Sequence, residues 1–396
     1  MRRDDRSALP PAPPIASLEW LALLSDIRQR FADRFGYKPD NLSYWNPKPL
    51  LGAEVERRIT PPRVPGSLTE YTYTSDLDLH ADIPRILGEP PGRSCLFTPS
   101  GTTSIANVVA YLRNAGVGTI AAVQPHYFAF SEFARFCGVG IASFDVERGA
   151  DGYHLPSAPQ VIASGAGAAW ISNPVYGTSV YYDEDELREW LAAVTDSGII
   201  VVVDESLAYA DRAVTAVATD ASLLIGIYVP HKALSLNGFR FSAVTFPEQL
   251  HASLEQWSDL FSGGLSAGNL DAIRHFSNPT FGRDMAIARA IQGELGGRME
   301  MVVSEFSFVE HDRAADGHFR QLYFPALDAS WQYNRDFLER LIFATGASFI
   351  PSARFSHPAS SNFCFRINLF RLDDAGVGAL HRLMRETGAI ILEQGK

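Results

Sequence analysis

The chain has 396 residues, of which 46% are hydrophobic and 20% charged, and its 45 acidic and 34 basic residues give a formal net charge of −11. This length and apolar content are enough to bury one large core or two. The acidic balance argues against nucleic acid or an anionic membrane as the main partner, although a local site can still bind an anion. The cysteines Cys95, Cys137 and Cys364 are scattered, which predicts no disulfide framework and no metal centre.

The amino terminus is expected to form a loose arm. Residues 1–20 are basic and then proline-rich, without the apolar core of a signal peptide. No apolar run reaches the roughly 18 residues that a membrane span requires. These features predict a cytoplasmic protein without a membrane partner. Apolar residues at helical spacing predict a helix over 17–36, whereas residues 51–80 lack strong periodicity and are predicted to be loop.

From about residue 90, short apolar runs alternate with amphipathic segments. Helices are expected at 103–115, 128–138 and 183–198. Apolar strands that alternate with helices predict an α/β domain with a mostly parallel sheet between helices. The expected strands are 93–98, 117–125, 168–174, 199–206, 223–230 and 239–247.

The rest of the chain is expected to be helical at first and then mixed. Helical patterns dominate from 247 to 306, and strands and helices mix over 322–396, which indicates a smaller C-terminal α/β domain. We predict three parts. They are an N-terminal arm and helix that pack on the small domain (1–65), a large domain (66–290), and a linking helix with the small domain (291–396).

A turn of small and hydroxyl residues follows the first strand of this series. It comprises Ser100, Gly101, Thr102, Thr103 and Ser104, and a helix follows it. A strand, turn and helix in this order direct backbone N–H groups and the positive end of the helix dipole to one point, which suits a phosphate group. A capped helix in a tight turn explains the same residues equally well.

An aromatic and an acidic side chain follow two later strands. Tyr127 comes just after the strand at 117–125, where its ring can stack on a flat ligand or pack against the next helix. Asp204 ends the apolar strand at 199–206. A carboxylate at that point requires a partner, such as a protonated ring nitrogen, unless it only caps the next turn.

The segment 227–240 contains a lysine and an arginine in apolar surroundings. Lys232 follows another strand end, where desolvation would lower the pKa of its amine and make it nucleophilic. Arg240 lies in an apolar stretch that is expected to bury it, and a buried guanidinium requires an anion. The alternative is a pair of exposed surface charges. Together with the residues above, the two describe a pocket for a flat, cationic, phosphorylated aldehyde.

These motifs resemble those of pyridoxal 5′-phosphate (PLP) enzymes of fold type I, in the class I/II aminotransferase family similar to aspartate aminotransferase. The resemblance covers about residues 40–396. It implies that Lys232 is the Schiff-base lysine, that Asp204 contacts the pyridine nitrogen and that Arg240 binds the phosphate. It also implies that the turn at Ser100–Ser104 binds the phosphate and that Tyr127 stacks on the ring.

The resemblance implies further residues for substrate and partner subunit. Arg366, on a late apolar strand, matches the arginine that binds the substrate α-carboxylate. Trp45 and Asn46 would line the entrance, unless they only pack at the surface. The family forms homodimers in which the neighbouring subunit lends a tyrosine to the phosphate. Tyr71 or Tyr73 would fill that role, and Tyr71 is preferred.

The sequence departs from the family pattern around the cofactor. An asparagine of the family bonds the phenolic oxygen O3′ of PLP, but Tyr176 occupies its place, so that either Asn173 or Tyr176 would contact O3′. Leu207 replaces a tyrosine that bonds the same oxygen. His231 replaces the serine before the lysine, and it would bond the phosphate or act as a second acid or base.

The resemblance predicts an aminotransferase that converts an α-amino acid to a keto acid, with Lys232, Asp204 and Tyr127 as catalytic residues. Because the departures surround O3′ and the phosphate, the alternative is a non-transaminating PLP enzyme of specialised biosynthesis: a lyase, a β/γ-replacement enzyme, a cyclase or an oxygen-dependent oxidase. A rival is a serine hydrolase with Ser266 as nucleophile, but the segment before its GLSAG motif is helical rather than a strand. A PLP-binding transcription regulator would need an attached DNA-binding domain, for which the residues before the fold leave no room.

Overall fold

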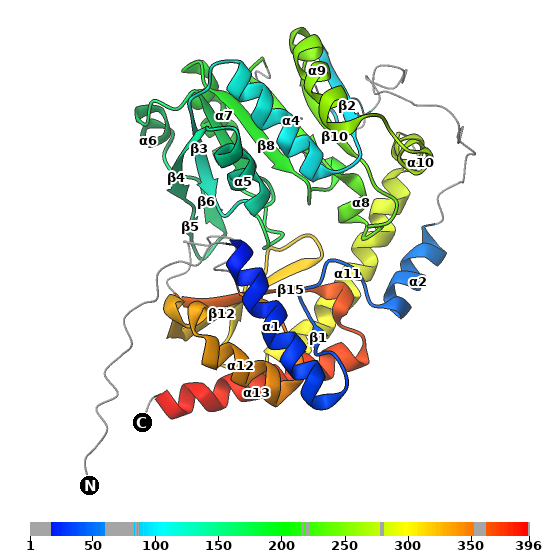
Figure 1. The fold of residues 1–396 in the computed structure, drawn as a ribbon, viewed down its shortest axis with the longest axis vertical. Coiled ribbons are helices and arrows are strands. Elements are labelled where there is room, and N and C mark those ends of the chain that lie inside the picture. The colour runs from blue at the N-terminus through cyan, green and yellow to red at the C-terminus, as the bar shows by residue number, and fades with distance from the viewer. Residues whose placement is uncertain are drawn as a thin grey trace.

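The structure, a computed structural model, describes residues 17–59, 83, 85, 87–89, 91–214, 218, 222–277, 281–351 and 362–394. They form two α/β units: a large unit around a seven-stranded sheet and a small unit around a four-stranded sheet (Figure 1). The long helix α11 (Phe281–Val303) runs from one unit to the other. The predicted α/β fold with a mostly parallel sheet is confirmed. The boundary predicted at residue 290 falls inside α11, and the three-part division stays a prediction.

The large sheet has the strand order β2-β10-β9-β8-β7-β3-β4. Its neighbouring strands are parallel except where β10 pairs with β2 and β9. Strands β7 and β9 are buried at every residue, as expected where helices cover both faces of a parallel sheet. The strands are β2 (Arg93–Thr98), β3 (Thr119–Gln124), β4 (Gly140–Asp145), β7 (Ala168–Ser172), β8 (Ile200–Glu205), β9 (Leu224–Tyr228) and β10 (Ser242–Pro247).

Side chains that alternate along β8 show how helices cover both faces of this sheet. Val202 belongs to an apolar cluster with α4, α5 and α9, whereas Val201 and Val203 belong to a cluster with α6 and α7. This alternation follows from the two-residue period of a strand. The helices of the large unit are α4 (Gly101–Asn114), α5 (Phe128–Phe136), α6 (Ala158–Ala163), α7 (Glu184–Asp196), α8 (Pro230–Ala233), α9 (His251–Ser262) and α10 (Ala267–Phe276).

The small unit has the strand order β11-β12-β15-β14, and all its pairs are antiparallel. The N-terminal helix α1 contacts α12, and β1 pairs with β13, so the N-terminal segment packs on this unit. The bounds are α1 (Ser17–Phe35), β1 (Asp40–Asn41), β11 (Glu310–His311), β12 (Phe319–Asp328), α12 (Arg335–Thr345), β13 (Ala347–Ser348), β14 (Ile350–Pro351), β15 (Asn362–Asn368) and α13 (Asp374–Gln394).

The prediction of a loop over residues 51–80 is wrong for residues 51–58, which are helical. Residues 49–58 form the helix α2 (Pro49–Arg58), which begins with a proline in its first turn, where the missing N–H is not needed. Glu54 accepts hydrogen bonds from Arg57 and Arg58, and such pairs one turn apart support an exposed helix. Only Val55 is buried among its residues, so an apolar stripe was absent from the sequence. Residues 60–82 lie outside the described part of the chain.

Two general expectations concern membranes and cysteines. None of the described helices is long and apolar enough to cross a bilayer. Cys95, Cys137 and Cys364 are free thiols. Among the described residues, no group of histidine, cysteine and acidic side chains could hold a metal ion.

Candidate active site

The predicted site residues of the large unit gather at one edge of its sheet. Because β2, β3, β7, β8 and β9 are parallel, their carboxyl ends lie at the same edge. Ligands of open α/β sheets bind beyond that edge. The antiparallel β10 begins there, which places Arg240 at this edge as well. The residues that follow these strand ends are Ser100, Tyr127, Asn173, Asp204 and Lys232.

Lys232 lies in the short helix α8, directly after β9. Burial lowers the pKa of its amine, with Asp204 opposing this effect and Arg366 adding to it. The amine lies 5.1 Å from the centre of the Trp45 ring and 5.8 Å from that of Tyr127. A desolvated amine with a lowered pKa is a better nucleophile and base at neutral pH.

Asp204 is the residue before the last in β8 and is buried. Burial raises the pKa of its carboxyl group, and the positive charge of Lys232 opposes that shift. One carboxylate oxygen accepts the backbone N–H of Ser206 at 3.0 Å. A buried carboxylate in this position is favoured in its charged form when a cation contacts it, as the protonated nitrogen of a pyridine ring would.

The hydroxyl-rich turn forms the N-terminus of α4. Ser100 caps the helix, since its hydroxyl accepts the backbone N–H of Thr103 at 3.2 Å. The hydroxyl of Ser104 forms hydrogen bonds with the hydroxyls of Thr98 and Ser242. The capped-helix interpretation therefore holds for Ser100. It is compatible with an anion site, because the first N–H groups of a helix remain available there.

Arg240 is exposed, so the prediction that its apolar surroundings bury it is wrong. The neighbour Phe241 is fully buried, so a buried apolar neighbour does not bury the residue beside it. Its positive charge still reaches the neighbouring site, since it contributes to the lowered pKa of His231.

His231 lies inside the protein beside Lys232. Burial lowers the pKa of its imidazole to about 3, with the charge of Lys232 acting in the same direction. Its Nδ1 accepts the backbone N–H of Phe241 at 3.3 Å. An imidazole held neutral in this way joins the turn after Lys232 to the beginning of β10.

The segment after β7 brings a buried tyrosine next to Tyr127. The side-chain oxygen of Asn173 accepts the backbone N–H of Tyr182 at 3.2 Å, and this bond shapes the loop. Tyr176 is buried with its ring centre 5.7 Å from that of Tyr127. Both rings lie in an apolar cluster with Leu207. The structure thus places Tyr176 beside Tyr127, and we call these two rings the aromatic wall. Whether Asn173 or Tyr176 contacts O3′ stays a prediction.

Arg366 comes from β15 of the small unit and is fully buried. Its guanidinium carbon lies 4.1 Å from the centre of the Phe319 ring and 5.0 Å from that of Trp45. One guanidinium nitrogen donates to the backbone carbonyl of Ser43 at 3.3 Å. A buried guanidinium beside two aromatic rings, whose charge acts on Lys232, suits a carboxylate ligand.

The remaining predicted residues have different positions. Asn46 is exposed and accepts a hydrogen bond from Asn237 at 3.3 Å, next to Trp45, whose carbonyl accepts from the same amide. Tyr71 and Tyr73 lie outside the described residues. Ser266 caps α10 and directly follows α9 rather than a strand, so the nucleophile elbow of a hydrolase is absent from this segment.

Phe319 is the residue of this site that the sequence analysis missed. It begins β12, and its ring meets Trp45 edge to face, with centres 4.8 Å apart. No local motif marks it, because its role depends on the pairing of β12 with β15. His318 beside it is also buried, and burial, then the charge of Arg366, lowers its pKa to about 3.

Gly101 lies close to Lys232 at the N-terminus of α4. A Cβ built at Gly101 would lie 2.9 Å from Cγ2 of Val229 and 3.7 Å from the amine of Lys232. The absence of a side chain at Gly101 therefore opens a path from the end of α4 to the lysine. The groups that could hold a phosphorylated ring near Lys232 are Asp204, Tyr127 and the N-terminus of α4.

The fold is that of the PLP-dependent aminotransferases of fold type I, whose solved structures match most of the chain. The multiple substrate aminotransferase from Thermococcus profundus is 14% identical, with a TM-score of 0.73 over 93% of this chain and 95% of that one. An aspartate aminotransferase from Rhodobacter sphaeroides is 22% identical, with a TM-score of 0.67 over 89% of this chain and 92% of that one.

MppP, solved after soaking with the product 2-ketoarginine, is 18% identical, with a TM-score of 0.66 over 87% of this chain and 99% of that one. No protein-family model and no curated protein matches the sequence. The chain therefore shares the fold of these enzymes at low sequence identity.

Proposed function

We propose that the chain is a PLP-dependent aminotransferase that acts on an α-amino acid through Lys232. The observation that carries the proposal is the arrangement of three charged groups. The amine of Lys232 and the guanidinium of Arg366 lie 5.1 Å and 5.0 Å from the centre of the same ring, that of Trp45. The charges of Arg366 and of the buried Asp204 both act on that amine. These three groups are the ones required to attach a pyridoxal, to hold its ring nitrogen charged and to bind a substrate carboxylate.

Each residue has a role that follows from its position. When bound, PLP supplies an electron sink for the negative charge that develops at the substrate Cα. Asp204 would hold the ring nitrogen in its protonated form. Arg366 would bind and orient the α-carboxylate, which fixes the Cα–H bond near the amine of Lys232. Lys232 would then accept the Cα proton and donate it again, as a general base and acid.

The cofactor phosphate would be held from three directions. The N-terminus of α4 at Gly101 and Thr102 offers backbone N–H groups, and Arg240 would turn its side chain from solvent to the phosphate. We propose that Tyr71 or Tyr73 of a second copy completes this set in a cytoplasmic homodimer. Tyr127 would cover one face of the ring.

The alternative is a PLP enzyme that does not transaminate. It is favoured by Leu207, which places an apolar side chain in the cluster with Tyr176 and Tyr127 where the family has a hydrogen-bonding phenol. Loss of that donor would change the charge on O3′ and, with it, the partition of the bound substrate between reaction types.

The test begins with absorbance spectroscopy of the purified protein with PLP. The wild-type protein should show the absorbance band of lysine-bound PLP, and Lys232→Ala should lack both this band and activity. Lys38→Ala changes an exposed lysine and serves as the matched control. A Lys232→Ala protein with full activity and an unchanged spectrum would refute both candidates. Amino acids that change the spectrum should release a keto acid if the enzyme transaminates, and a change without keto acid favours the alternative.

A further inference from the structure

Four side chains form a hydrogen-bonded network between the large and small units, away from Lys232. Asp312 lies just after β11, and one of its carboxylate oxygens accepts a hydrogen bond from Nε of Arg148 at 3.1 Å. Its other oxygen accepts the hydroxyls of Tyr153 at 2.9 Å and Tyr323 at 3.0 Å. The two phenols also contact each other. We call Arg148, Tyr153, Asp312 and Tyr323 the Asp312 network.

The network is mostly buried, with Arg148 as its most exposed member at 23% of its side chain. Tyr153 and Tyr323 are 2% and 1% exposed, and the side chain of Asp312 is 9% exposed. The guanidinium carbon of Arg148 lies 3.8 Å from the centre of the Tyr323 ring. Buried charged groups are stable only when their hydrogen-bonding partners are in place, so this set favours one arrangement of the two units.

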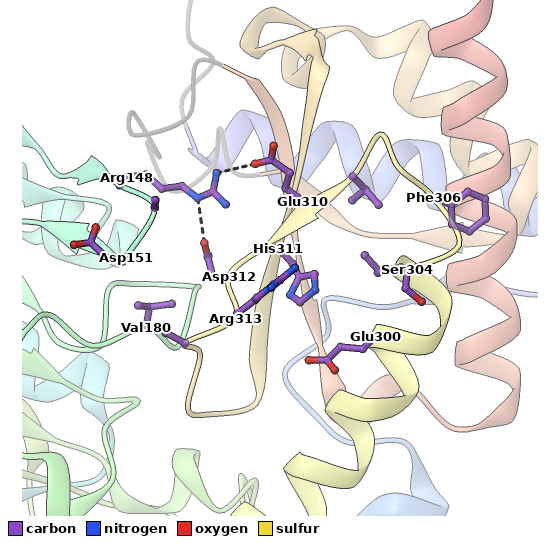
Figure 2. A pocket seen from close by; sticks show the side chains of 16 residues that line it. Arg148, Asp151, Val180, Glu300, Ser304, Phe306, Glu310, His311, Asp312 and Arg313 are labelled. Carbon is purple, nitrogen blue, oxygen red and sulfur yellow. Dashed lines mark hydrogen bonds and ion pairs between the residues drawn. The ribbon is translucent and has the colours of Figure 1, made fainter.

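The large-unit half of the network lies on a short hairpin that is hydrogen-bonded to α7. Arg148 and Tyr153 are cross-strand partners in the hairpin of β5 (Glu147–Arg148) and β6 (Tyr153–His154). Glu186 of α7 accepts the backbone N–H of Leu155 at 2.7 Å, just after this hairpin. Figure 2 shows Arg148 extending from the hairpin to Glu310 and Asp312 of the small unit, at one wall of a cavity of about 890 Å³.

The small-unit half is continuous with the strand pair that holds the candidate carboxylate site. Tyr323 of β12 lies opposite Cys364 of β15, and Gln321, two residues before it, lies opposite Arg366. A shift of β12 against the hairpin would therefore move β15 and the guanidinium of Arg366. Lys232 stays with the large sheet, so such a shift changes the distance between the two groups.

We propose that Asp312 is a positioning residue that sets the place of Arg366 relative to Lys232 through the Asp312 network. This inference rests on the proposed function, because it assigns the substrate carboxylate to Arg366. None of the network's four residues belongs to the candidate active site described above or is among the groups that act on Lys232. Its effect should therefore appear in carboxylate recognition and not in the reactivity of the cofactor itself.

The test compares two reagents that attack the imine carbon joining PLP to Lys232 and release the lysine amine. Amino-oxyacetate carries a carboxylate for Arg366, whereas methoxyamine has the same reactive group without one. The ratio of their rate constants, followed by absorbance with holoenzyme, measures carboxylate recognition. We expect Asp312→Asn to lower this ratio at least about fivefold, the lower end of typical coupling between sites. The rate with methoxyamine should stay unchanged.

A second variant and a control guard against loss of folding. Tyr153→Phe removes one hydroxyl and keeps the ring, so it should fold and lower the ratio in the same direction. Glu393→Gln, which removes an exposed charge paired with Arg340 in the small unit, should keep the wild-type ratio. Thermal unfolding identifies the variants that fold.

The outcomes separate the two proposals. A wild-type protein that reacts with neither reagent overturns the proposed function and, with it, this inference. A wild-type protein that prefers amino-oxyacetate, together with folded network variants that keep that preference, overturns the inference alone. Variants that slow both reagents equally also overturn it, because they show general damage to the site instead of a loss of carboxylate positioning.

Discussion

Glu205, the residue after Asp204, should make the stability of the protein depend on pH. It is fully buried at the end of β8, and one of its carboxylate oxygens accepts the backbone N–H of Val214. The other, Oε2, has no hydrogen-bond partner among the described residues. Burial raises the pKa of this carboxyl to about 8, with the Val214 bond opposing the shift and the charge of Glu89 adding to it.

The sign of the effect follows from proton linkage. An unfolded chain releases this proton near the ordinary pKa of 4.5, whereas the folded chain keeps it up to about pH 8. Within that window the folded state binds the extra proton, so the free energy of unfolding falls as pH rises. At about 1.4 kcal/mol for each tenfold change in proton concentration, the whole window amounts to about 5 kcal/mol. Above pH 8 no further loss from Glu205 is expected.

Urea unfolding of wild type and Glu205→Gln between pH 5 and pH 9 tests this reasoning. The amide keeps an oxygen for Val214 and carries no charge, so the free energy of unfolding of the variant should exceed that of wild type increasingly as pH rises. Glu189→Gln, an exposed position on α7, should follow the wild-type curve. Parallel pH profiles of wild type and Glu205→Gln would refute the argument.

Three further predictions concern the candidate site. Gly101→Val would place side-chain atoms against Val229 and in the path to Lys232, so we expect at least about tenfold weaker PLP binding in an absorbance titration, with unchanged circular dichroism. Arg366→Lys loses the planar fork of the guanidinium, and the KM for the amino acid should rise about tenfold or more; an unchanged KM contradicts the assignment. Since the pKa of His231 is lowered to about 3, His231→Asn should keep every limb of the pH–rate profile between pH 5 and pH 9, and the loss of a limb would show that the imidazole titrates in catalysis.

The large sheet could be predicted because its strands are buried on both faces. Strands β7, β8 and β9 appear in the sequence as uninterrupted apolar runs, and their ends then locate Asp204 and Lys232. Strand β4 was missed because it lies at the sheet edge, where none of its residues is buried. Strand β12 was missed because Arg320, Gln321 and Pro325 interrupt its apolar residues.

The parts of the site that depend on distant contacts could not be predicted. Arg240 shows that apolar neighbours in the sequence do not predict burial. Phe241 beside it is buried, but the side chain of Arg240 is exposed. Phe319 joins the site only because β12 pairs with the strand that holds Arg366. Sequence patterns report burial along one segment, and neither of these positions is a property of one segment.

The departures from the family pattern after β7 also bear on how the two units meet. Ser179 belongs to the same loop as Tyr176, and its positive φ of 61° is a backbone conformation that side chains other than glycine rarely adopt. Its hydroxyl accepts the backbone N–H of Phe319 at 3.2 Å, and its carbonyl accepts that of Asp316 at 2.8 Å. A Cβ at Gly317 would come within 2.6 Å of that hydroxyl, so the approach is close.

This loop therefore does two things at once. Through Tyr176 it supplies part of the aromatic wall beside Lys232, and through Ser179 it holds the beginning of β12, whose Phe319 packs on Arg366. A change in the loop sequence should therefore alter the surroundings of Lys232 and the position of Arg366 together. The effect of these departures is therefore better tested by comparing substrates than by measuring cofactor binding alone. The reason is that the same loop also contacts the small-unit residue Phe319 and, through it, Arg366.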